Sequence, residues 1–187
     1  VYIDCSNCWF TRLNVGDVPA LSYLICGPGN YLSSLDLSNN SKLQYLCCQN
    51  ISAESLDLSH NTELEYLDCS WMKSLTTLDL SANAKLQYLD CFNCALTSLV
   101  LSGCPSLAVL YCHNNDLAEL DISQNEILIH DYLQGELKQV RESSSVTYYE
   151  YGFDVEDEES GETTYAAALR VDPTMKFAMP GRTIYGV

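Results

Sequence analysis

The sequence predicts a β-rich solenoid of short stacked repeats, with parallel strands and little α-helix. One observation is a cysteine that recurs every 21 or 22 residues, and another is the pattern Leu-x-x-Leu-x-Cys in which it stands. The third is that these Leu-rich segments lack helical periodicity and are bounded by Ser, Asn, Gly and Pro. A period of about 20 residues is typical of one unit stacked on copies of itself. The recurring cysteines are Cys5, Cys26, Cys48, Cys69, Cys91 and Cys112.

Each repeat consists of two similar halves. In the first half, the second Leu and the Cys alternate inward if the segment is a strand. The second half reads Leu-x-x-Leu-Asp-Leu-Ser, as in residues 32–38 and 75–81. A single repeat cannot bury its own apolar edge, so stacking is required. We expect a parallel sheet from the first halves, and extended or 3₁₀ segments or a second sheet from the second halves. Complete repeats begin at Leu21, Leu43, Leu64, Leu86 and Leu107.

The pattern Leu107-x-x-Leu110-x-Cys112-x-x-Asn115-x-Leu117 resembles the leucine-rich repeat family. More specifically, residues 1–128 are similar to the bacterial class with nested repeats of roughly 21 residues, sometimes called IRREKO. The resemblance implies a right-handed solenoid with its strands on the concave face. It also implies an Asn or Cys in each repeat that bonds loop backbone between windings. The matching positions are Cys8, Gly29, Ile51, Met72, Cys94 and Asn115, of which Gly29, Ile51 and Met72 depart from the pattern.

The second halves have a comparable polar position of their own. A stacked Asn can satisfy the backbone donors and acceptors of a buried turn, which otherwise carry a free-energy penalty. We therefore expect a second column of Asn-type residues inside the solenoid. Its members are Val18, Asn40, Asn61, Asn83, Cys104 and Asn125.

Ten cysteines in a short chain ordinarily indicate disulfides, but these positions favour free thiols. Stacked strands lie ~4.8 Å apart, whereas disulfide Cβ atoms are separated by roughly 3.5 to 4.5 Å. The two Cys-x-x-Cys pairs, Cys5 with Cys8 and Cys91 with Cys94, are interpreted as packing residues. Cys47 belongs neither to the recurring inward cysteines nor to the two Asn-type columns. We therefore expect it on the exposed concave face, as the one readily modified thiol.

The pattern changes after Ile122, and residues 129–187 are expected to form a cap and a small β appendage. Residues 127–140 are mixed and predict a turn or short helix over the end of the core. Residues 146–153 and 163–171 have strand composition around an acidic turn at 154–162, and residues 176–187 add a further candidate strand. At the other end the chain starts within a repeat, which suggests a fragment whose exposed edge pairs end to end with another copy.

Charge and motifs exclude several function classes. A net charge of −16 disfavours nucleic acid, which requires clustered Lys and Arg, and no apolar stretch reaches the ~20 residues of a membrane helix. The histidines His60, His113 and His130 are scattered, without a His-Glu-x-x-His motif, and no Gly-rich phosphate loop is present. The acidic run 154–159 lacks EF-hand spacing. We expect no enzyme activity, no cofactor and no metal.

A column of tyrosines is the leading candidate binding feature, with a second column two positions further along each repeat. Strand alternation turns both columns away from the Leu core. The tyrosines can support the sheet by stacking, and they can also bind a protein surface rich in Lys or Arg, or a glycan; the two roles are compatible. The predicted binding residues are Tyr2, Tyr23, Tyr45, Tyr66, Tyr88, Asp68, Asp90 and Tyr111; Asp4, Ile25 and Cys47 complete the second column.

A further acidic column lies in the second halves and consists of Asp36, Asp57, Asp79 and Asp121. It is either satisfied by local hydrogen bonds or bound to a cation. For the chain as a whole we predict a noncatalytic recognition module that binds another protein on its concave face. The alternatives are a structural spacer or adhesive stalk, and glycan binding through the tyrosines. The family resemblance implies an exported or surface-attached bacterial protein.

Overall fold

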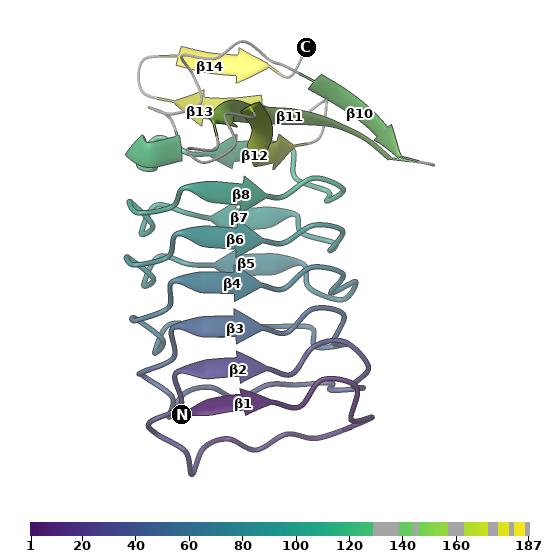
Figure 1. The fold of residues 1–187 in the computed structure, drawn as a ribbon, viewed down its shortest axis with the longest axis vertical. Coiled ribbons are helices and arrows are strands. Elements are labelled where there is room, and N and C mark those ends of the chain that lie inside the picture. The colour runs from purple at the N-terminus through teal and green to yellow at the C-terminus, as the bar shows by residue number, and fades with distance from the viewer. Residues whose placement is uncertain (129–138, 144–145, 157–162, 172–175, 180–181, 186–187) are drawn as a thin grey trace.

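The computed structural model describes residues 1–128, 139–143, 146–156, 163–171, 176–179 and 182–185, with side chains up to Leu128. The chain winds into a parallel β-solenoid in which each winding contributes one short strand to a long sheet (Figure 1). These strands pair in register, with Leu24 beside Leu46 and Leu67 beside Leu89. The predicted fold class is confirmed. The six strands are β1 (Tyr2–Asp4), β2 (Tyr23–Ile25), β3 (Tyr45–Cys47), β4 (Tyr66–Asp68), β6 (Tyr88–Asp90) and β8 (Val109–Tyr111).

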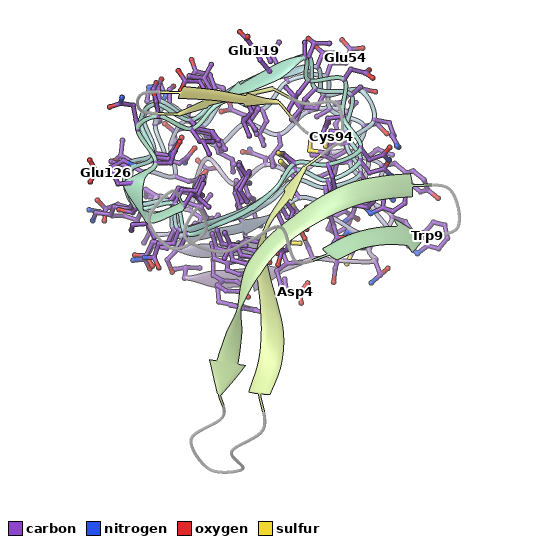
Figure 2. All side chains as sticks on the ribbon, turned by 90° about the horizontal axis from the view of Figure 1, so that it is seen from above. Asp4, Trp9, Glu54, Cys94, Glu119 and Glu126 are labelled. Carbon is purple, nitrogen blue, oxygen red and sulfur yellow. The ribbon has the colours of Figure 1, made fainter. Side chains whose placement is uncertain are left out.

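The second halves form strands only in the later windings. β5 (Thr77–Asp79) pairs in parallel with β7 (Ser98–Val100), and β9 (Glu119–Asp121) belongs to a separate small sheet. Across residues 1–128, helical structure is confined to 126–128. The expected second sheet is therefore present in part, on the side of the solenoid opposite the long sheet, where Figure 2 labels Glu119.

The interior consists of Leu and Cys columns. Leu24, Leu46, Leu67 and Leu89, at the strand centres, are fully buried, and so are Cys26, Cys48, Cys69, Cys91 and Cys112. Each buried Leu contributes about 1.5–3 kcal/mol relative to an exposed one. All ten cysteines are free thiols. Desolvation raises the pKa of Cys26 to about 12 and that of Cys48 well above its ordinary value, so the column stays neutral.

Buried Asn side chains join successive windings, as the second-half pattern predicts. The Asn61 amide donates to the carbonyls of Leu37 (3.1 Å) and Asn40 (2.9 Å), and the Asn83 amide donates to Leu58 (3.1 Å) and Asn61 (2.9 Å). Asn40 and Asn125 make the same pair of bonds one winding back. Cys104 takes the place of Asn and donates to Leu80 O at 3.2 Å.

The first-half column is formed where the pattern holds and is displaced elsewhere. Asn115 donates to Cys91 O and Cys112 O, both at 2.9 Å, and Cys94 donates to Cys69 O at 3.2 Å. In the second winding Asn30, not the aligned Gly29, makes these bonds. Gly29 has φ of 77°, which frees the next residue to point inward. Ile51 and Met72 are buried apolar residues, whereas Cys8 is exposed, so its expected packing role is wrong.

The C-terminal strands pair with the last strands of the solenoid, β8 and β9. β10 (Gln139–Ser143), β11 (Val146–Glu156) and β12 (Thr163–Val171) are antiparallel, and β12 pairs in parallel with β8. β13 (Lys176–Met179) pairs with β9 and with β14 (Arg182–Tyr185). The strands expected at 146–153 and 163–171 are present, and β11 runs on through residues 154–156 of the expected acidic turn. Of the cap predicted at 127–140, residues 127–128 are helical and 139–140 begin β10. Residues 129–138 and the rest of the acidic turn lie outside the described residues. The part of β11 and β12 furthest from the core extends outward on the long sheet's side (Figure 2).

Candidate functional site

The predicted tyrosine column exists as a continuous stack on the outer face of the long sheet. From Tyr2 through Tyr23, Tyr45 and Tyr66 to Tyr88, successive ring centroids are 4.5, 3.9, 4.2 and 4.4 Å apart. The rings of the last three pairs are almost parallel, with interplanar angles of 6°, 6° and 4°. Parallel in-register strands bring identical positions together at ~4.8 Å, which is close to aromatic stacking distance.

The stacked tyrosines stabilise the sheet. Each aromatic pair contributes roughly 0.5–1.5 kcal/mol beyond its buried area. Desolvation, followed by hydrogen bonding with the neighbouring hydroxyls of Tyr23 and Tyr66, raises the pKa of Tyr45 strongly, and desolvation also raises the pKa values of Tyr66 and Tyr88. The hydroxyls therefore stay protonated throughout the physiological range. The result is a rigid row of neutral groups that can both donate and accept hydrogen bonds.

The second column places acidic groups beside this stack. Asp68 Oδ1 accepts hydrogen bonds from the backbone amide (3.0 Å) and the hydroxyl (2.6 Å) of Ser70. Asp90 Oδ1 accepts from the backbone amide of Phe92 at 2.9 Å. These local bonds hold both carboxylates in one orientation next to the rings. At the last winding Tyr111 contacts Tyr88 edge to face, with centroids 5.8 Å apart and planes at 81°.

The structure thus brings together all eight predicted binding residues on one surface. We call this surface the Tyr face and define it by Tyr2, Tyr23, Tyr45, Tyr66, Tyr88, Asp68, Asp90 and Tyr111. Tyr2 is 61% exposed, and the other four stacked tyrosines are half-buried.

Cys47 does not behave as predicted. Its side chain is only 6% exposed, although it lies on the outer side of β3. Gln49 Nε2 donates to its sulfur at 3.5 Å, and the thiol donates to Asp68 Oδ2 at 3.8 Å. Desolvation raises the pKa of Cys47, so the thiolate is disfavoured. The short side chain is covered by longer neighbours, and Cys8 is the exposed thiol instead.

The acidic column of the second halves is satisfied locally. The backbone amides of Ser38, Ser59, Ser81 and Ser123, each two residues on, donate to the Oδ1 atoms of Asp36, Asp57, Asp79 and Asp121 at 2.9–3.0 Å. The backbone amide and then the hydroxyl of Ser38 lower the pKa of Asp36, and those of Ser81 lower the pKa of Asp79. Within the described residues, no group of three or more His, Cys, Asp or Glu side chains is arranged to hold a metal ion.

The histidines lie apart from one another where the structure describes them. His60 Nδ1 is 3.1 Å from the hydroxyl of Ser59, and His113 is buried and stacks on Phe92 with centroids 4.3 Å apart. His130 is outside the described residues. In the described part of the chain, no helix has the length and apolar character needed to cross a membrane.

A second aromatic surface has no counterpart in the sequence-based predictions. Trp9, Phe10, Tyr31 and Trp71 are exposed on the loops that follow β1, β2 and β4. We call these loops, together with Phe92, the aromatic edge. A signal for it exists in the repeat alignment, because Trp71 stands where Asn7, Asn50, Asn93 and Asn114 stand in other windings.

Comparison with known proteins connects this architecture to a solved bacterial structure. No protein-family model and no curated protein sequence matches the chain. The functional domain of InlJ from Listeria monocytogenes, described as including a cysteine ladder, matches with a TM-score of 0.65 and 38% identity. The match covers 67% of this chain and 28% of that one, so this chain spans less than a third of its neighbour's length. With the repeat period and the parallel solenoid, this likeness makes the chain a leucine-rich-repeat-like protein.

Proposed function

We propose that this protein is a noncatalytic recognition module in which the Tyr face binds a protein partner that presents Lys or Arg. In this proposal residues 1–128 are the binding solenoid, residues 129–187 cap it, and the parent protein is an exported or surface-attached bacterial protein. The observation that carries the proposal is the stack of five tyrosines beside oriented carboxylates. The likeness to part of the functional domain of InlJ from Listeria monocytogenes supports it.

The rigidity of the stack favours binding. Ordering a flexible side chain at an interface costs about 0.5–1.5 kcal/mol, and this penalty is already met when rings are held by their neighbours. Tyr is also enriched among the residues that dominate protein interfaces, because it combines apolar area with a hydroxyl. The strands β1, β2, β3, β4 and β6 that carry the stacked tyrosines lie one above another in the long sheet (Figure 1), so the Tyr face presents such groups at regular intervals.

Charge indicates the chemistry of the partner. The chain has a formal net charge of −16, and Asp68 and Asp90 lie within the Tyr face. A cationic surface would be steered toward this face and would meet acceptors already oriented by Ser70 and Phe92. We therefore expect affinity to fall as the salt concentration rises.

The decisive experiment measures how well two pairs of matched variants capture the partner protein. One variant changes Tyr45, Tyr66 and Tyr88 together to Ser, which removes the rings with their phenolic hydroxyls. Its partner variant changes the same three residues to Phe, which keeps the stacked rings and removes the hydroxyls. We expect the Ser variant to lose capture and the Phe variant to keep the fold with weakened capture. Thermal unfolding of both proteins checks that lost binding is not lost folding.

The second pair tests the charge argument. Asp68→Asn with Asp90→Asn should weaken capture and its salt dependence, because Asn preserves the local turn but removes the carboxylate. Asp57→Asn with Asp79→Asn makes the same change in the second-half column and should leave capture intact. Equal effects of the two pairs, or full capture by the Ser variant, would move the binding surface away from the Tyr face.

Glycan binding on the Tyr face is a weaker candidate. A sugar ring needs an exposed aromatic face, whereas the faces of Tyr23, Tyr45 and Tyr66 are occupied by neighbouring rings at 3.9–4.5 Å. The stack therefore offers mainly edges and hydroxyls, which suit a protein surface better.

A further inference from the structure

Both tryptophans of the chain are exposed on the aromatic edge. Trp9 is 71% exposed and contacts Tyr31 at a centroid distance of 5.9 Å, and Trp71 is 47% exposed. Figure 2 shows Trp9 at the side of the solenoid, separate from the sheet that carries Asp4. Backbone bonds between successive loops, such as Trp71 N to Phe92 O at 2.8 Å, hold this edge in place. Large exposed aromatics held in this way are candidates for ligand contact.

The left-handed backbone conformation of Trp71 indicates that this residue is kept for a function. Trp71 has φ of 64°, and the equivalent Asn50, Asn93 and Asn114 have φ of 60°, 57° and 57°. Asn tolerates this left-handed conformation, whereas a bulky residue there is an outlier under strain. Strained residues gather at functional sites, where the strain is offset elsewhere in the structure. Asn at position 71 would give less backbone strain, so stability alone does not account for Trp there.

The surroundings of Trp71 combine a ring platform with polar donors. Phe92 meets Trp71 edge to face at 5.3 Å and 90°, and the Lys73 ammonium lies 5.5 Å from the Trp71 ring centroid. Lys73 and Asn114 both donate hydrogen bonds to the Asn93 side-chain oxygen. Asn93 is buried, and its oxygen holds the Lys73 ammonium beside the ring. The ammonium can therefore orient a ligand that rests on the ring.

We propose that Trp71, with Lys73 and Phe92, forms a binding site for neutral oligosaccharides, separate from the Tyr face. A pyranose ring has an apolar C–H face for the aromatic platform and a rim of hydroxyls for the polar side chains around it. The net charge of −16 disfavours acidic glycans. A protein hot spot would instead sit in a desolvated central pocket, which an edge loop does not supply.

Tryptophan fluorescence reads this site directly, because the chain has two tryptophans. In a Trp9→Phe variant, Trp71 is the remaining fluorophore excited selectively over tyrosine. Cellohexaose, chitohexaose and α-1,6-mannohexaose are titrated separately to millimolar concentration, with oligogalacturonate as the acidic comparison. We expect a saturable change in Trp71 emission from at least one neutral sugar and none from the acidic one. No response to any of the three neutral sugars would overturn the proposal.

A substitution taken from the repeat itself separates binding from folding. Trp71→Asn installs the residue of the equivalent positions, and calorimetric binding of the responding sugar should fall at least tenfold. Its thermal unfolding midpoint should be unchanged or higher, because strain is removed. The triple Tyr-to-Ser variant of the Tyr face should retain sugar binding. Sugar binding that survives Trp71→Asn would contradict the assignment. So would an aromatic edge that binds no sugar and whose Trp71→Asn variant loses capture of the protein partner.

Discussion

At the residue scale, a few buried polar side chains decide whether the windings stack. The amide of Asn61 donates to two carbonyls of the preceding winding, and the amides of Asn40 and Asn83 repeat the arrangement. Cys104 shows that a thiol with one hydrogen bond can stand in for the amide. The sequence predicted this column because the position recurs within a regular half-repeat. It missed Asn30, because the neighbouring Gly29 shifts the inward-pointing residue by one place.

We predict that Asn61→Ala lowers the free energy of unfolding by about 2 kcal/mol, since two buried hydrogen bonds are lost. Asn61→Cys should lose less, because the thiol can keep one bond as Cys104 does. Urea denaturation of the three proteins measures both differences. An Ala variant as stable as the parent, or a Cys variant less stable than Ala, would contradict the role given to this column.

Thiol exposure gives a second test at this scale. Cys8 is exposed and the other nine cysteines are buried. An aromatic disulfide reagent should therefore titrate one thiol in the native protein and ten after denaturation. Cys8→Ser should remove the native reaction, whereas Cys47→Ser should leave it unchanged. Rapid native reaction that persists in the Cys8→Ser protein would contradict the burial of the other nine thiols.

At the element scale, the repeat period located every strand of the long sheet within the solenoid. Spacing alone sufficed because in-register stacking forces equivalent residues into one column, as Tyr45, Tyr66 and Tyr88 show. The period did not predict that β12 pairs with β8 and β13 with β9, because that pairing joins segments of different pattern. Nor did it predict the burial of Cys47, which depends on its particular neighbours, Gln49 and Asp68.

Close packing between second-half turns predicts a glycine requirement. A Cβ atom at Gly103 would lie 1.9 Å from the carbonyl oxygen of Ser81, so backbone would have to move. Gly103→Ala should therefore destabilise the protein by roughly 1–3 kcal/mol. Gly16→Ala is the matched control, because its Cβ would meet side-chain atoms of Asn14 and Asn39 at 3.3 and 3.4 Å. Urea midpoints that order the two variants oppositely would refute this packing.

For the whole molecule, stability should depend on pH at both extremes. Hydrogen bonds from serine lower the pKa values of Asp36 and Asp79 below 3.8, so their contribution is lost as pH falls through those values. Burial raises the pKa of Cys26 and Cys104 from 9.0 to about 12, so their contribution is present below pH 9 and is lost as pH rises toward 12. Urea midpoints should be highest between about pH 5 and 8. Constant stability above pH 9 would contradict the buried thiol column.

The proposed role of the Tyr face in recognition is tested most directly by photocrosslinking to the captured partner. A benzophenone amino acid replaces Tyr66 in one protein and Thr77, which is exposed on β5 on the opposite side, in another. We predict a covalent adduct with the partner from position 66 and none from position 77. Adducts from position 77 alone, or equally from both positions, would contradict binding through the Tyr face.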